Sequence, residues 1–177
     1  MLKKQWLVVL VAFVVPIVFI WWWWGGFNKV KVRTQVLGPY HYAYQDFQGS
    51  LADAGRAQAQ VRATLTGAGI PVGDSVTVLL TDPRKTPQNS QQAQVGYLVA
   101  ENVRQAPPGL KLATLPRRRV LTATVQAGVL IAPSKAYQAL YGRLHAQGRD
   151  IRLPTVEIYR AGDSINRMGV LTVQMAD

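Results

Sequence analysis

Cysteine is absent from the 177-residue chain, and histidine occurs only twice, at His41 and His145. The lack of cysteine excludes disulfide bonds, thiol catalysis and thiolate metal sites, while it leaves the redox compartment open. The two histidines share no spacing typical of a zinc site or of a Ser-His triad. The sequence therefore predicts no metal site and no cofactor.

Acidic residues are also scarce, with nine Asp and Glu against twenty Lys and Arg and a net charge of +11. This charge could meet anionic lipid, nucleic acid or an acidic partner. The arginines are scattered, which is typical of a solvated surface, so we expect no nucleic-acid partner. Their one cluster, Arg117 to Arg119, is expected at a turn or strand end in solvent, with lipid headgroup contact as the alternative.

Tryptophan is missing from most of the chain, because all five residues are Trp6 and Trp21 to Trp24. They bound an uncharged apolar run, Trp6–Trp24. Nineteen residues at helical rise span about 28 Å, close to the hydrocarbon thickness of a bilayer. Consecutive tryptophans suit a membrane interface, where the ring is apolar and its N–H is wet. The sequence predicts an uncleaved, single-pass N-terminal transmembrane helix, with residues 1–27 as the membrane anchor.

A cleaved signal peptide and a buried core helix are the two alternatives to an anchor. A cleaved signal peptide has a shorter apolar core and a small-x-small cleavage site, which the run lacks. A buried core helix would not explain four consecutive tryptophans. The orientation is nearly tied, because basic residues flank both ends of the run, but a short N-terminal tail is easier to leave in the cytoplasm. We therefore expect the soluble domain on the exocytoplasmic (periplasmic) side, with the lipid bilayer as a partner.

The remaining chain, residues 28–177, repeats one pattern twice. Repeat one (28–100) and repeat two (110–177) each read as strand, strand, helix, strand, strand, and the linker 101–109 carries Pro107-Pro108-Gly109. An offset of 79 residues maps Gly49 onto Gly128 and Val78 onto Glu157. The fold class predicted is α+β, with two pseudo-symmetric β-β-α-β-β repeats that share one core.

Helical spacing predicts one helix in each repeat, over residues 50–66 and 133–147. In the first, Ser50 would cap the helix with Asp53 as its capping-box partner. Ala54, Ala57, Val61 and Leu65 would then form the buried face. In the second, Pro133 suits the first turn. Its buried face would be Tyr137, Leu140, Tyr141 and Leu144.

The doubled unit resembles the GyrI-like effector-binding domain (the AraC-type effector-binding, SHS2-repeat family), in its membrane-anchored branch. The resemblance covers Val30 to Met175. It rests on the order of five segments: Gly38–Ser50, Leu80–Pro87 with its D-P turn, Leu115–Gly128, Ala136–Leu140, and Pro154–Asp163 with its E-I-Y strand. It implies two halves about a pseudo-twofold axis, and a groove that holds small organic molecules, often cationic or hydrophobic, against aromatic rings and a carboxylate.

The sequence also departs from that family. The final strand, Thr172 to Met175, lacks the second Glu that members often carry. Some members hydrolyse strained or electrophilic molecules with a pocket carboxylate and an aromatic, often Trp, which this domain lacks. The function predicted is non-catalytic binding of a small organic ligand or of an unidentified partner at a membrane. The alternatives are a membrane-tethered hydrolase, in which Glu157 activates water, and a scaffold protein whose groove is closed.

Candidate ligand-binding residues follow from strand alternation. Tyr40, Tyr42 and Tyr44 share one face of a strand, Glu157 and Tyr159 share a face of another, and Tyr97 lies on a third strand. Tyrosine rings and one carboxylate could bind a cation. The predicted ligand-binding residues are Tyr42, Tyr44, Tyr97, Glu157 and Tyr159. For Glu157 the competing interpretation is an ion pair with Arg160 or Arg143, and for the tyrosines it is simple packing.

Overall fold

The computed structural model describes residues 2–162 and 168–177, which have the mixed α+β composition that the sequence predicts. Their α-helices are α1 (Leu2–Trp23), α2 (Ala54–Gly67) and α3 (Ala132–His145). The strands are β1 (Lys31–Leu37), β2 (Tyr40–Gln48), β3 (Ser75–Leu79), β4 (Gln92–Leu98), β5 (Lys111–Leu115), β6 (Arg118–Gln126), β7 (Thr155–Arg160) and β8 (Val170–Ala176). Asp163, the last residue of the Pro154–Asp163 segment, lies outside the described residues.

The eight strands form one antiparallel sheet in the order β1-β6-β8-β7-β3-β4-β2-β5. Both halves of the domain place their elements in the order strand, strand, helix, strand, strand. If each strand of one half is replaced by its counterpart in the other half, the sheet order is simply reversed. The sheet therefore has a pseudo-twofold axis between its central strands, β3 and β7.

The first strand of each half is exchanged between the halves. β1 pairs with β6, with Lys31 opposite Thr124, and β5 pairs with β2, with Tyr40 opposite Leu115. Both are edge strands, so within the described sheet each has a single neighbour. Neither half completes its own part of the sheet without a strand from the other.

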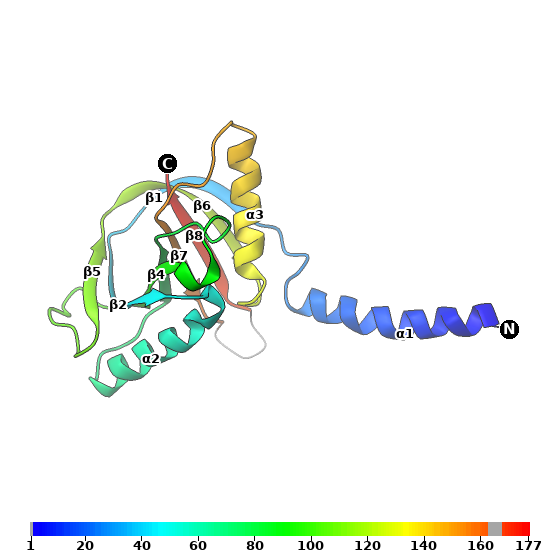
Figure 1. Cartoon of the computed structure of the whole chain (residues 1–177), viewed down its shortest axis with the longest axis horizontal. Helices are drawn as coiled ribbons and strands as arrows, with labels where there is room; N and C mark the ends of the chain where they lie inside the picture. The colour runs from blue at the N-terminus through cyan, green and yellow to red at the C-terminus, as the bar shows by residue number, and fades with distance from the viewer. Residues whose placement is uncertain (1, 163–167) are drawn as a thin grey trace.

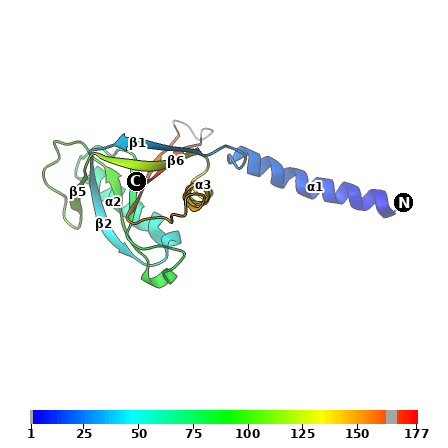
Figure 2. The ribbon, with the colours of Figure 1, turned by 90° about the horizontal axis from the view of Figure 1, so that it is seen from above.

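Two very short connections force the sheet to curl. Only Gly38 and Pro39 separate β1 from β2, and only Pro116 and Arg117 separate β5 from β6, although each pair of strands lies toward opposite edges. A two-residue connection spans at most about 10 Å, so the edges must approach each other. Figure 2 shows β1 and β6 along one side of the domain and β2 and β5 along the adjacent side. A Cβ on Gly38 would lie 2.9 Å from the Pro116 carbonyl oxygen, so the two connections touch.

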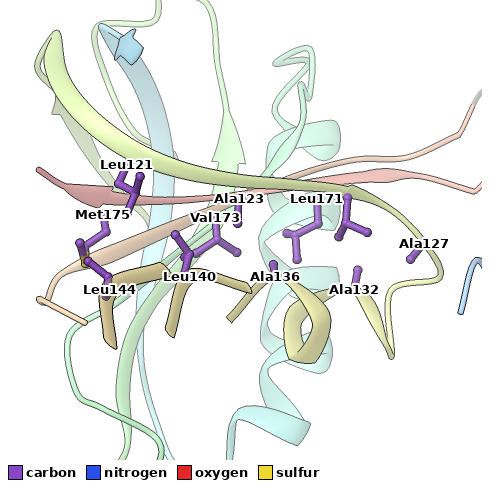
Figure 3. Close-up of a cluster of buried hydrophobic side chains, with 11 residues drawn as sticks. Leu121, Ala123, Ala127, Ala132, Ala136, Leu140, Leu144, Leu171, Val173 and Met175 are labelled. Carbon is purple, nitrogen blue, oxygen red and sulfur yellow. The ribbon is translucent and has the colours of Figure 1, made fainter. Parts of the chain in front are cut away.

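Both domain helices cover the same face of the sheet, which we call the helix face. α2 packs on β2 and β4, and α3 packs on β6 and β8, so the central strands lie between them. Figure 3 shows the fully buried Leu140 and Leu144 of α3 packing against Val173 and Met175 of β8. Burial of each such side chain contributes about 1.5–3 kcal/mol, and this contact holds α3 on the sheet.

The predicted apolar faces are confirmed in their centres and wrong at Tyr141. Val61, Leu65, Leu140 and Leu144 are fully buried, as expected. Tyr141, however, is 43% exposed, because the buried face of α3 is formed by Ala132, Ala136, Leu140 and Leu144.

The helix starts also differ in part from the prediction. Pro133 lies in the first turn of α3, as predicted. Ser50 makes no capping hydrogen bond, because residues Leu51–Asp53 form a 3-10 turn before α2. Asp53 instead forms an exposed ion pair with Arg56 at 2.7 Å.

Helix α1 extends away from the domain (Figure 1). Its apolar side chains, among them Phe13 and Ile17, are exposed. In the part of the chain that the structure describes, no helix meets the combined length and apolarity needed to cross a membrane. The predicted transmembrane helix is therefore not supported by this structure.

Hydrogen bonds hold the end of α1 against the domain. The Gly128 amide donates to the Trp24 carbonyl at 3.0 Å, and the Asn28 side chain donates to the Gln126 carbonyl at 2.6 Å. The Lys135 ammonium donates to the Gly26 carbonyl. These contacts fix where α1 leaves the domain, next to the start of α3.

Candidate functional site

The five predicted ligand-binding residues lie on both faces of the sheet. Tyr42 and Tyr44 lie on the face opposite the helices, in one cluster with Val76, Val156 and Ile158. Tyr97, Glu157 and Tyr159 lie on the helix face, because Tyr97 and Tyr159 both stand opposite Ser75, and Glu157 stands two residues along. The structure therefore separates the five residues into two groups.

The tyrosines of the opposite face are packed together. Tyr42 is buried, donates a hydrogen bond to the Gln94 side-chain oxygen at 2.7 Å, and has its ring centroid 5.2 Å from that of Tyr44. Burial and the neighbouring Tyr44 raise the pKa of the Tyr42 phenol to about 12. The charge of Arg118 acts to lower the pKa of the same phenol. The Nη2 atom of Arg118 is buried, so the prediction that the arginine cluster lies in solvent is wrong for this residue.

On the helix face, two predicted residues are part of the packing. Tyr97 is 9% exposed beneath α2, in contact with Val61 and Leu65, with the Arg62 guanidinium 5.6 Å from its ring centroid. Tyr159 packs against the cluster under α3. In these places the tyrosines fill space.

Glu157 lies at the centre of the helix face. It stands directly opposite Thr77 across the central strand pair, and Val173 stands on its other side. The offset of 79 that predicts Val78 as its counterpart is one residue off in this strand, because Val78 pairs with Val156 on the opposite face. Thr77 is the counterpart, so the pseudo-twofold axis runs between Thr77 and Glu157.

The carboxyl group of Glu157 is largely desolvated. Burial raises its pKa above the ordinary value of 4.5, while the nearby Tyr137 hydroxyl acts to lower it. Neither predicted ion pair forms, since Arg160 binds Asp74 at 3.1 Å and no described salt bridge involves Arg143. A carboxyl group that is desolvated without an arginine partner is a common feature of functional sites.

A cavity of about 600 Å³ opens on the helix face beside α3, at one end of the central strands. Its wall is largely apolar, and it is lined by Leu79, Asp82, Pro83, Arg84, Ser134, Tyr137, Gln138, Tyr141, Ile151, Leu153 and Thr155. The Tyr137 and Thr155 hydroxyls lie 2.8 Å apart in its floor. Tyr137 links this cavity to Glu157. The pKa of the Tyr137 phenol is raised by burial and also by the charge of the nearby Glu157 carboxyl group.

Most residues of this cavity were not predicted as site residues. Tyr137 and Tyr141 stand one helical turn apart, and that spacing predicts core packing. Leu80–Pro87, noted only as part of the family resemblance, supplies Asp82, Pro83 and Arg84. In the described residues no group of three or more acidic or histidine side chains could hold a metal ion.

Comparison with known proteins establishes the fold. No family model matches the chain, and no curated protein matches it. The EcmrR C-terminal domain matches with a TM-score of 0.64 at 10% identity, over 84% of this chain and 96% of that domain. SAV2435 bound to tetraphenylphosphonium matches with a TM-score of 0.54 at 10% identity, over 82% of this chain and 92% of that protein. An uncharacterized conserved protein from Listeria innocua matches with a TM-score of 0.59 at 9% identity, over 81% and 91%.

The domain therefore shares the fold of these proteins. A further match, to EcmrR in its complex with DNA, covers 98% of this chain and 68% of that one, with a TM-score of 0.65 at 10% identity. Coverage of that extent includes α1. At these identities the likeness defines the architecture, and the chemistry of the site comes from this chain's own residues.

Proposed function

We propose that this protein binds a small hydrophobic organic molecule, without catalysis, in the cavity beside α3. The observation that carries the proposal is an apolar cavity of about 600 Å³ lined by two tyrosine rings, with the desolvated Glu157 next to its floor. This volume lies within the range of roughly 300–1,000 Å³ that small-molecule sites occupy. The fold supports the proposal, since SAV2435 shares it and is bound to tetraphenylphosphonium in its structure.

A cavity-filling variant tests this proposal. Ser134 lines the cavity, and its counterpart in α2 at the offset of 79 is Gly55, where an added Cβ meets nothing within 4 Å. Triphenylphosphine oxide serves as a probe in calorimetric titration of the full-length protein in a nonionic detergent, which shields α1. We expect Ser134→Trp to weaken binding by about tenfold or more and Gly55→Trp to leave it unchanged. Equal binding by both variants would place the probe outside the cavity.

We also propose that α1 attaches the domain to a membrane, with the domain on the exocytoplasmic side. The support is the exposed apolar surface of α1, which ends in Trp21 to Trp24, and the adjoining Leu130, which is 77% exposed. Exposed apolar surface of this extent marks a membrane or protein contact. Lys29, Lys31 and Arg33 follow, where anionic headgroups would lie.

Alkaline carbonate extraction of membranes tests the attachment. We expect the intact protein to stay in the membrane fraction, and added protease to cleave the domain only from the exocytoplasmic side. Release of the intact protein would contradict membrane attachment and would favour a role for α1 in contacts between proteins.

A further inference from the structure

The aromatic wall of the cavity already carries a positive charge. The Arg84 guanidinium lies over the Tyr141 ring, 5.4 Å from the ring centroid. It is held there by Asp82, whose two carboxylate oxygens accept from Nε at 3.0 Å and from Nη2 at 2.8 Å. Nη2 also donates to Asp150 at 3.1 Å. A planar guanidinium with a bidentate partner is well suited to keep this position.

The charges around the cavity balance one another. Lys85 completes the group, with its ammonium 3.2 Å from Asp150 and 3.9 Å from Asp82. The two carboxylates and the two cations cancel. Arg84 holds the pKa of Asp82 below its usual value, and the Ile151 amide with Arg84 and Lys85 lowers that of Asp150 to about 2, so both carboxylates stay ionised and paired. Neither has a free charge for a ligand cation.

The buried carboxyl group of Glu157 is also poorly placed to bind a cation. Glu157 is not among the residues that line the cavity, and Tyr137 is its link to it. An organic cation in this cavity would therefore lose its hydration and meet no unpaired negative charge, which is costly. It would also have to displace Arg84 from the ring of Tyr141, the surface on which cations bind to aromatic residues.

We infer that the cavity selects uncharged hydrophobic molecules over organic cations, and that Arg84 determines this preference by occupying the face of Tyr141. The inference rests on the proposed function, and it names the class of ligand. It makes Arg84 a specificity-determining residue that supplies in advance the positive charge that a cationic ligand would bring.

Two probes of nearly equal shape test this inference. Triphenylphosphine oxide is neutral, and methyltriphenylphosphonium carries the same three rings with a positive charge. Titrations of the full-length protein in a nonionic detergent give the ratio of the two dissociation constants. We expect the wild-type protein to bind the neutral probe about tenfold more tightly or better, and Arg84→Gln to strengthen binding of the cation by roughly 2- to 30-fold, which is the range for a cation over an aromatic ring.

Two control variants separate Arg84 from a general effect of charge. Arg62 lies over the ring of Tyr97 at 5.6 Å and lines no part of the cavity, so Arg62→Gln should leave the ratio unchanged. Arg84→Lys retains the charge and should retain the preference for the neutral probe. The ion pairs of Arg84 are exposed, so we expect Arg84→Gln to fold, which a melting curve checks.

Each outcome decides a different point. Tighter binding of the cation by the wild-type protein would overturn the inference, whether or not Arg84→Gln folds. A preference for the neutral probe that survives Arg84→Gln would remove Arg84 from its role. If neither probe binds, or if Ser134→Trp does not weaken binding of either, the proposed function itself fails.

Discussion

The surroundings of α2 and of α3 are built from the same elements, yet equivalent positions on the two helices have different neighbours. At the offset of 79, Gln58 and Arg62 on α2 correspond to Tyr137 and Tyr141 on α3. Gln58 donates to the Gly96 carbonyl at 2.9 Å, and Arg62 covers Tyr97. On α3, the two tyrosines instead line an open space of about 600 Å³. One half therefore uses these positions to hold its helix on the sheet, and the other uses them as walls.

The segment after each helix accounts for much of this difference. After α2 the chain returns to the sheet through Ile70 and Val72, which pack into the cluster with Val61 and Leu65. After α3 the return passes through Ile151 and Leu153, which line the cavity, and Leu153 remains 39% exposed. A duplicated fold can thus keep one half as support while the other half holds the binding space.

The largest effect is expected from separating the halves. Residues 28–106 alone would lack β6, the partner of β1, and would leave the side of β3 that pairs with β7 without a neighbour. We expect this fragment to show no cooperative thermal transition by circular dichroism, and expect mixing with residues 107–177 to restore one. A cooperative transition in the isolated fragment would show that the halves are independent.

The two helix cores can be compared with one matched pair of substitutions. Leu65 on α2 and Leu144 on α3 are counterparts, and both are fully buried. Leu65→Ala and Leu144→Ala should each cost about 2–5 kcal/mol in the free energy of unfolding, because each leaves a cavity. Chemical denaturation should show a single transition in both variants. Two separate transitions in either variant would mean that the halves unfold independently.

A smaller effect is expected from removing one hydroxyl in the cavity floor. Tyr137→Phe removes the partner of the Thr155 hydroxyl, and Thr155 is fully buried. The expected loss is about 1–3 kcal/mol in the free energy of unfolding. Tyr141→Phe removes a hydroxyl from an exposed residue on the same helix and should cost almost nothing. Equal losses of unfolding free energy in the two variants would contradict a stabilising hydrogen bond between Tyr137 and Thr155 in the cavity floor.

The smallest effect is expected at Glu157, and it depends on pH. Because burial raises the pKa of Glu157, the folded protein binds its proton more tightly than the unfolded chain does. This contribution to stability is complete when the pH is below the pKa of Glu157 in the unfolded chain. It is lost as the pH rises through the higher pKa of Glu157 in the folded protein. Glu157→Gln should therefore melt at a higher temperature than wild type near neutral pH, and this advantage should shrink as the pH falls toward 4.5.

Asp150→Asn should change the melting temperature in the opposite direction in the same series of pH values. The pKa of Asp150 is lowered to about 2, so its contribution is present at neutral pH and fades as the pH falls below the ordinary value of 3.8. This variant should melt below wild type at neutral pH. If Glu157→Gln also melts lower there, the carboxylate of Glu157 is paired in a way that the structure does not contain.

Local patterns predicted much of the fold and little of the site. The spacing of Val61, Leu65, Leu140 and Leu144 depends only on helical periodicity, so their burial followed from the sequence. Strand exchange did not follow, because every strand with one apolar face could pair with several others. The counterpart of Glu157 was misplaced for a similar reason, since a slip of one residue moves a side chain to the other face.

The cavity depended on details that periodicity does not contain. Tyr141 matched the spacing of a core residue, but the face of α3 that is buried on the sheet begins with Ala132 and Ala136 and leaves Tyr141 exposed. Arg84 gave no signal as a site residue, because its position over Tyr141 depends on Asp150, 66 residues away along the chain. Contacts of this kind are set by tertiary structure and could not be read from neighbours in the sequence.

Strand exchange also imposes a delay during synthesis between the appearance of β1 and that of its pairing partner β6. β1 is made before the rest of the sheet, and its partner β6 follows roughly 90 residues later, which at ribosomal rates of about 5–20 residues per second is on the order of 5–20 s. Throughout that interval an amphipathic strand lies unpaired beside the apolar helix α1. The nascent chain is therefore most prone to aggregation between the emergence of β1 and that of β6, and a ribosome that stalls in this interval would hold a chain that no part of its own sequence can yet protect.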